Sequence, residues 1–311
     1  MNTACFLPYV GLGTCLLHMS YIREFARKNG PVKILTFSKS LADALKFDQD
    51  VKEVIVIEKY NKKFFDILKL ANFLKNLQLK KLYIFKSSLR FYFAGKLARI
   101  ETKSYPFYKK KNLHLVKEAQ KFTNKNLNLK DCPTETTLQV SQTLLDETKK
   151  TITSNKKNIL IAPAASGDTT MWSSTYFIKL MKKLDAKFNC FFIIAVDSSE
   201  REKKIANEII QSFDKNKTMS LSNKTISQTM PIISCCSVSI CNDTSFQHLS
   251  CGLNVPTIIL RFDTPDAYSS YSKFQYSVLP EGHSKINHDS RADPSLISVD
   301  QILNKVIKLI N

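Results

Sequence analysis

The side chains best suited to chemistry lie within one short segment: Asp243, Thr244, Ser245 and His248. A largely apolar run precedes them at residues 238–241, and a second follows at residues 257–260. Asp and Thr are good helix N-cap residues, and a helix N-terminus favours a bound phosphate. The segment therefore predicts a site for a phosphate-bearing ligand. A capped turn with a half-buried histidine is the alternative that it leaves open.

The elements around this cluster predict how it is positioned. The two apolar runs indicate buried strands, and Gly252 with Pro256 ends a short helix between them. Strand, turn, helix and strand form the unit of a parallel sheet, and ligands of such sheets bind at the carboxyl ends of the strands. We therefore expect the four side chains at that edge.

The rest of the chain continues the same alternation. Strands are expected at residues 5–10, 32–37, 54–57, 82–85, 158–162 and 190–196, and helices at residues 15–28, 64–77 and 299–309. Strands separated by helices predict parallel βαβ connections. The 311 residues suffice for two domains, and the polar, lysine-rich residues 149–157 mark a boundary. We expect an α/β fold with domains at residues 1–152 and 153–311.

The formal charge of +19 is concentrated in the first half of the chain. Residues 1–150 hold 28 Lys and Arg against 13 Asp and Glu, whereas the remainder holds 18 against 14. A basic half suits an anionic partner such as an acidic glycolipid or a membrane surface. A general richness in lysine is the alternative. No nucleic-acid-binding signature accompanies the charge, and we expect no nucleic-acid partner.

The cysteines and the N-terminal segment indicate the compartment. The eight cysteines show no CxxC pair and no metal-ligand spacing, which favours buried thiols in a reducing compartment. Residues 4–19 are apolar but lack a basic n-region, are interrupted by Pro8, Gly11 and Gly13, and are too short to span a bilayer. We expect a first strand and helix there, a cytoplasmic protein and no metal site.

The segment Asn242-Asp-Thr-Ser-Phe-Gln-His248, followed by Leu-Ser-Cys-Gly-Leu-Asn-Val-Pro256, carries the most specific resemblance. It is similar to the donor-site segment of glycosyltransferase family 9, the heptosyltransferases of the lipopolysaccharide inner core, with Ser245 in place of the usual glycine. Further segments match in order: residues 47–55, residues 87–90 with 94–100, and Pro163-Ala-Ala-Ser166 followed by Trp172. The resemblance implies a GT-B fold, with two Rossmann-like domains whose parallel sheets face a central cleft.

The resemblance also implies a donor site. The residues that it assigns to the diphosphate and sugar of the donor are Ser166, Asp243, Thr244, Ser245 and His248. It places Glu200 at the ribose of the nucleotide. Arg201, Lys224 and Arg261 are candidates to offset the charge of the diphosphate. Trp172, the only tryptophan, is expected to pack against its own helix rather than to touch ligand.

Two catalytic side chains implied by the resemblance are replaced in this chain. The family has an aspartate base directly after the N-terminal glycine turn, here Gly11-Leu-Gly13, and a lysine two residues before the tryptophan; this chain has Thr14 and Thr170. Loss of a general base typically costs about 10²–10⁴-fold in rate, and loss of one stabilising group about 10²–10³-fold. His18, four residues after Thr14, is a candidate substitute base with an ordinary pKa of about 6.5. A packed helix histidine is the alternative.

The resemblance thus implies a cytoplasmic glycosyltransferase, inverting and metal-independent, in peripheral contact with the inner membrane face. The expected donor is a nucleotide-diphosphate sugar, ADP-heptose, and no cofactor is expected. The expected acceptor is an anionic glycolipid of lipopolysaccharide type. The alternative is a catalytically weakened relative that binds nucleotide sugar or glycolipid without transfer.

Overall fold

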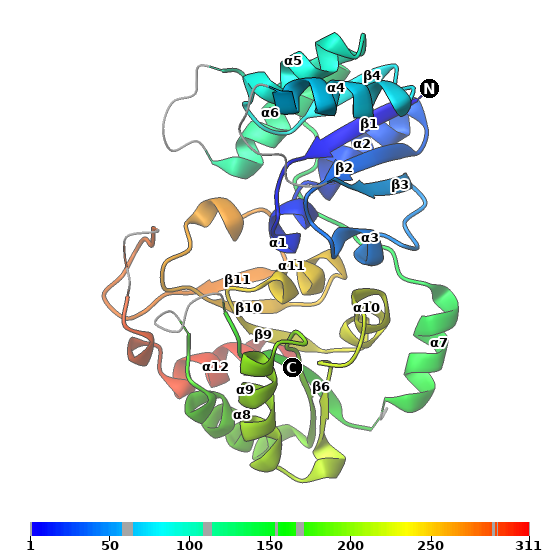
Figure 1. Ribbon diagram of the computed structural model, residues 1–311. Coiled ribbons are helices and arrows are strands. Elements are labelled where there is room, and N and C mark those ends of the chain that lie inside the picture. The colour runs from blue at the N-terminus through cyan, green and yellow to red at the C-terminus, as the bar shows by residue number, and fades with distance from the viewer. Residues whose placement is uncertain are drawn as a thin grey trace. The chain divides into compact units, whose positions relative to one another are not determined.

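The computed structural model describes residues 2–57, 65–107, 114–152, 155–165, 171–287, 290 and 292–310. The chain forms two compact units, Met1–Gln139 and Val140–Asn311, each built on one parallel sheet (Figure 1). The division falls before α7 (Gln142–Thr151), earlier than the boundary expected at 152/153, because α7 packs against α10 (Ile226–Ser234) of the second unit. In the described part of the chain, no helix combines the length and apolar character needed to cross a membrane.

The first unit contains a five-stranded sheet in the order β3-β2-β1-β4-β5, with every neighbouring pair parallel. Its strands are β1 (Thr3–Leu7), β2 (Val32–Thr36), β3 (Val51–Val56), β4 (Lys81–Ile84) and β5 (Glu101–Ser104). Its helices are α1 (Leu12–Leu16), α2 (Met19–Asn29), α3 (Leu41–Ala44), α4 (Phe65–Asn76), α5 (Leu89–Leu97) and α6 (Leu115–Leu127). The alternation predicted from the sequence is therefore confirmed, with β5 as an additional short strand.

Both faces of this sheet are covered, because side chains of a strand alternate between them. Ala4 and Phe6 of β1 pack into an apolar cluster with Leu70 of α4 and Phe91 of α5. On the opposite face the ring of Tyr83 in β4 lies 4.2 Å, centroid to centroid, from that of Phe25 in α2.

The helix expected at residues 15–28 is two helices. α1 ends at Leu16, α2 begins at Met19, and His18 occupies the N-cap position between them. His18 makes no side-chain cap; its ring nitrogen Nδ1 instead lies 2.7 Å from the carbonyl oxygen of Thr14. The imidazole therefore folds back onto the preceding turn, and does not project from a continuous helix as the spacing suggested.

The second unit contains a six-stranded sheet in the order β11-β10-β9-β6-β7-β8, again with every neighbouring pair parallel. Its strands are β6 (Lys157–Ala162), β7 (Cys190–Ile194), β8 (Thr218–Ser220), β9 (Val238–Asn242), β10 (Thr257–Leu260) and β11 (Gln275–Val278). Besides α7 and α10, its helices are α8 (Ser174–Phe188), α9 (Glu200–Gln211), α11 (Ser245–Gly252) and α12 (Val299–Ile310).

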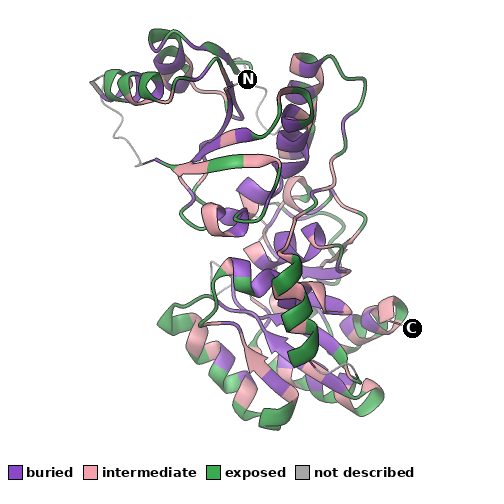
Figure 2. Ribbon diagram, turned by 90° about the vertical axis from the view of Figure 1, so that its right-hand side faces the viewer, coloured by how far each residue is buried: buried purple, intermediate pink, exposed green. Residues whose placement is uncertain are grey.

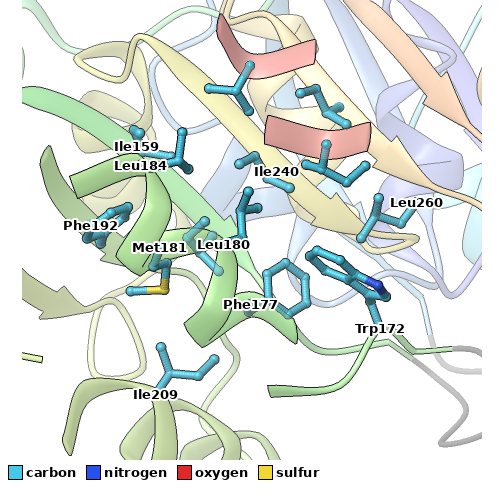
Figure 3. Close-up of a cluster of buried hydrophobic side chains, with 14 of the residues drawn as sticks. Ile159, Trp172, Phe177, Leu180, Met181, Leu184, Phe192, Ile209, Ile240 and Leu260 are labelled. Carbon is cyan, nitrogen blue, oxygen red and sulfur yellow. The ribbon is translucent and has the colours of Figure 1, made fainter. Parts of the chain in front are cut away.

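The core of this unit lies between the sheet and α8, α9 and α12. Figure 3 shows Phe177, Leu180 and Met181 of α8 among side chains of the strands, with Trp172 at the start of the segment that leads into α8. In Figure 2 the strands of this sheet are largely buried, while the outer faces of its helices are exposed. The sheet is thus a rigid base, and its carboxyl edge is where loops are free to carry function.

Candidate functional site

The predicted cluster lies at the carboxyl edge of the second sheet, where β9 ends and α11 begins. Thr244 is the N-cap of α11, and its hydroxyl oxygen accepts a hydrogen bond from the backbone N–H of Phe246 at 3.0 Å. Asp243, Thr244 and Ser245 are half-buried, and His248 is buried one turn further along the helix. The strand, the capped helix and the place of the cluster are as the sequence predicted.

Gln247 joins Asp243 to His248. Its Nε2 donates to Asp243 Oδ1 at 2.5 Å and lies 3.2 Å from His248 Nε2. Its Oε1 is buried and has no hydrogen-bond partner among the described residues. The sequence reasoning missed Gln247, although it lies in the first turn of α11, close in the chain to Asp243 just before the N-cap.

His248 is a neutral hydrogen-bonding group at physiological pH. Burial lowers its pKa from 6.5 to about 4. Its Nδ1 lies 2.7 Å from the hydroxyl oxygen of Tyr271, and the two rings stack with centroids 5.8 Å apart. If Gln247 donates to Nε2, the proton of the neutral ring sits on Nδ1 and is donated to Tyr271. No signal in the sequence marks Tyr271, which lies 23 positions further on.

The loop after β10 completes the hydrogen-bonded series. The hydroxyl of Thr264 donates to Asp243 Oδ2, so that both carboxylate oxygens accept a bond. Burial raises the pKa of Asp243, the nearby Asp263 adds to the rise, and the bonds from Thr264 and Gln247 oppose it. The backbone oxygen of Thr264 accepts from Arg261 Nε and Nη2, at 3.0 and 2.6 Å.

Arg261 is committed to this loop. Its guanidinium is 3% exposed and pairs with Asp266 at 2.6 Å in addition to the two bonds to Thr264. Of the three cations considered for the diphosphate, Arg261 is the buried one, and its guanidinium nitrogens donate to Thr264 and Asp266. Its contribution to the site is to fix Thr264, which in turn fixes Asp243.

Asn242, the last residue of β9, forms hydrogen bonds with Pro163 and Trp172, which lie on either side of the predicted site residues Ser166 and Thr170. Its Nδ2 donates to the carbonyl oxygen of Pro163 at 2.6 Å, and its Oδ1 accepts from the N–H of Trp172 at 3.0 Å. Trp172 is fully buried and donates from Nε1 to the carbonyl oxygen of Ile297 at 3.0 Å, which confirms its expected packing role. Ser166 and Thr170 lie outside the described residues.

Glu200 and Lys224 reach the same edge, because α9 and α10 begin after the parallel strands β7 and β8. Glu200 is in the first turn of α9; its side chain is 90% exposed and pairs with Lys203 at 2.9 Å. Lys224 is exposed just before α10. Arg201 is also exposed and donates from Nη1 to the carbonyl oxygen of Ala165 at 3.0 Å.

The first unit carries the remaining predicted residues at the turn after β1. Gly11 is exposed, while Gly13 and Thr14 are half-buried. A Cβ on Gly11 would lie 3.8 Å from Thr14 Oγ1, an ordinary contact, and Gly11 has an extended backbone with φ of −72°. Neither the space nor the backbone therefore demands glycine at position 11.

His18 is enclosed by aromatic rings. Its imidazole stacks on Tyr9 with centroids 5.1 Å apart, and Phe85 meets it edge-on at 5.4 Å. The side chain is fully buried, its Nε2 has no partner among the described residues, and burial lowers its pKa to about 4. His18 is therefore a packed histidine and not a solvent-accessible base. A fall in activity near pH 6.5 is not expected from its titration.

The cysteines and other potential metal ligands are dispersed. Every cysteine is a free thiol, and burial raises the pKa of those in the strands, such as Cys5 and Cys241. Within the described ranges, no group of three His, Cys, Asp or Glu side chains is arranged to hold a metal ion.

Comparison with known proteins gives one family and one fold. The model of the family described as glycosyltransferase family 9 (heptosyltransferase) matches residues 82–286. The chain is similar to the structure of E. coli ADP-heptose lps heptosyltransferase II, with a TM-score of 0.74 and 16% identity over 100% of this chain and 98% of that one. It is also similar to the glycosyl transferase family 9 structure from Veillonella parvula DSM 2008, with a TM-score of 0.78 and 11% identity over 99% and 97%.

A third similar structure is E. coli heptosyltransferase WaaC with ADP-2-deoxy-2-fluoro heptose, with a TM-score of 0.72 and 13% identity over 99% of both chains. These neighbours confirm the GT-B class of fold that the sequence predicted, with one Rossmann-like sheet in each unit. No curated protein matches the sequence significantly.

Proposed function

Because the chain belongs to glycosyltransferase family 9, we propose that it transfers a heptose from ADP-heptose to an anionic glycolipid of lipopolysaccharide type. The transfer inverts the anomeric centre, needs no metal and takes place at the inner membrane face. The observation that carries the proposal is the hydrogen-bonded series Thr264–Asp243–Gln247–His248 at the N-terminus of α11. It stands on the segment that resembles the family's donor site, and one similar structure contains an ADP-linked fluoro-heptose.

The groups at this edge of the sheet have separate tasks in donor binding. The N-terminal end of α11 stabilises the diphosphate through its dipole, and the exposed Lys224 and Arg201 add positive charge at the same edge. Asp243 accepts from hydroxyl groups of the sugar with the lone pairs that Thr264 and Gln247 leave. Gln247 is fully buried and bonds to Asp243 and His248, so its task is to hold these two side chains in place.

The deprotonation of the acceptor hydroxyl is the step that this chain supports least. Thr14 stands where the family has its aspartate, and a hydroxyl is no general base near neutral pH. His18 has its Nδ1 on the carbonyl oxygen of Thr14 and its Nε2 buried. These observations favour the second candidate function, a relative that binds nucleotide sugar without transfer. If His18 acts as the base, its acid limb lies near pH 4.

Donor binding is the first test. Calorimetric titration with ADP and with ADP-heptose should show micromolar binding to the wild type, and His248→Ala should weaken it about tenfold through loss of one buried hydrogen-bonding group. His283→Ala is the matched control, because His283 is exposed in the same unit. If His248→Ala and His283→Ala bind alike while both remain folded, the donor site lies elsewhere.

Turnover is the second test and separates the two candidate functions. A wild type that transfers heptose is an enzyme despite Thr14. A wild type that binds donor without transfer is the weakened relative, and Thr14→Asp with Thr170→Lys should then raise transfer by rebuilding the pair that the family uses. Turnover of the wild type with an acid limb near pH 6.5 would contradict the assignment of His18 as the base, since its pKa is lowered to about 4.

A further inference from the structure

One helix of the first unit presents apolar side chains on both of its faces. Phe91, Ala94 and Ala98 hold the inner face of α5 in the core, and Figure 1 shows α5 beside α4. On the outer face Leu89, Phe93 and Leu97 are 54, 51 and 57% exposed. Their spacing of four residues places them in one stripe along the helix. A contiguous exposed apolar stripe marks a surface for an apolar partner, so this stripe calls for an occupant.

The stripe continues onto the segment after β5. The ring of Tyr92 lies 5.8 Å from that of Phe93 and 5.5 Å from that of Phe107, which is 39% exposed. We call Leu89, Tyr92, Phe93, Leu97 and Phe107 the α5 surface. Among the described residues, no segment covers its exposed side chains.

Basic side chains border the α5 surface. Residues 86–107 contain five basic residues and one acidic residue. At about 100° per residue, Arg90 and Lys96 lie roughly 60° to either side of the centre of the stripe. Lys96 Nζ lies over the ring of Tyr92, 5.6 Å from its centroid, so the charged group sits beside the apolar side chains.

We propose that the α5 surface docks on an anionic phospholipid bilayer, with the stripe inserted at the level of the acyl boundary and the bordering cations at the headgroups. A bilayer interface offers apolar and anionic character in this layered order. A nucleic acid would contact the cations but has no counterpart for Leu89 and Leu97. The inference deepens the proposed function and rests on it only in that the acceptor is anchored in lipid.

Vesicle partition tests the proposal without donor or acceptor, so that failure of transfer and failure of docking are distinguishable. The full chain is sedimented with phosphatidylcholine vesicles, with and without phosphatidylglycerol, at about 0.05 and 0.5 M salt. We expect partition to the anionic vesicles. Lys96→Gln should lower it about fivefold and Phe93→Gln about tenfold, because the first removes one cation near the surface and the second an inserted ring.

Matched controls lie at the opposite edge of the sheet, on and before β3. Lys52→Gln removes the same charge and Phe47→Gln a ring that is 36% exposed, and neither should change partition by more than about twofold. Leu97→Gln is a second variant of the stripe if Phe93→Gln melts early. Equal losses for Lys96→Gln and Lys52→Gln, with none for Phe93→Gln and Leu97→Gln, would overturn the proposal in favour of diffuse attraction.

The oligomeric state supplies the remaining test. If the chain sediments as a dimer without vesicles and Phe93→Gln renders it monomeric, the occupant of the α5 surface is a second copy and the proposal is overturned. A monomer that partitions as expected supports it.

Discussion

Replacing Asn242 by alanine should destabilise the second unit by about 2–4 kcal/mol. The side chain is fully buried and bonds both ends of one loop, donating to Pro163 and accepting from Trp172. Alanine leaves a buried carbonyl and a buried N–H without partners, at about 1–3 kcal/mol each. The second unit spans 140–311. For a unit of this size, the loss corresponds to a fall of roughly 5–15 °C in melting temperature.

Trp172 makes this measurement specific. It is the only tryptophan and is fully buried beside Asn242, so its fluorescence reports unfolding of the second unit and loosening of the loop ends. We expect Asn242→Ala to melt early and to emit at longer wavelength at room temperature. Asn207→Ala is the control, because Asn207 is exposed within α9 and alanine is a better helix former there.

Asn242→Asp separates hydrogen bonding from packing. The introduced carboxyl keeps the volume and the acceptor for the N–H of Trp172, but when ionised it faces the carbonyl oxygen of Pro163 without a proton to donate. Burial raises its pKa in the folded state above the unfolded value of about 3.9, so stability is lost as the pH rises through the folded pKa. The defect should therefore be larger at pH 8 than at pH 5.

Two results would refute this reasoning. A melting temperature for Asn242→Ala within about 1 °C of Asn207→Ala would show that the three bonds of Asn242 contribute nothing net. If the destabilisation caused by Asn242→Asp did not depend on pH, then loss of the hydrogen bond donated to Pro163 would not be its cause.

Two further predictions concern the buried histidines and the packing of α5. Burial lowers the pKa values of His18 and His248 to about 4, so below about pH 6.5 the unfolded chain binds protons that the folded chain does not. The free energy of unfolding should therefore be greatest above pH 6.5 and fall towards pH 4, by about 2 kcal/mol per histidine at pH 5. In urea titrations, His18→Gln and His248→Gln should each abolish the part of this pH dependence that comes from the replaced histidine. Gly95→Ala should destabilise the first unit by about 1–3 kcal/mol, since the new Cβ would lie 2.3 Å from Thr102 Oγ1. Combining it with Thr102→Ala should cost less than the sum of the two single changes, and additive losses in this double-mutant cycle would contradict the predicted clash.

Local sequence determined most of the strand and helix order. The segment from β9 to β10 combines an apolar run, an N-cap threonine and a terminating glycine and proline, all of which act within a few residues. The strands that were missed are short and polar: β5 reads ETKS, β8 reads TMS and β11 reads QYSV. Each lies at an edge of its sheet, where pairing with one neighbour, and not an apolar pattern, holds the strand in place.

Tertiary packing decided the boundary between the units and the state of the candidate site. α7 begins before the lysine-rich residues 149–157 that suggested the boundary, yet contact with α10 assigns it to the second unit. The motif itself placed Asp243 just before the helix that carries His248, because their spacing is local. That Tyr271 bonds His248 and that Thr264 bonds Asp243 depends on which loops the parallel strands bring to the same edge.

The same distinction separates the two roles considered for His18. Its spacing from Thr14 is a property of the sequence, and it suggested an imidazole presented on a helix face. Tyr9 and Phe85, which enclose the ring, come from the turn after β1 and from the end of β4. Desolvation by these distant segments, and not the identity of the residue, lowers the pKa and keeps the imidazole neutral. Sequence thus determined that a titratable group stands beside the turn, and only the tertiary structure decided whether it meets solvent.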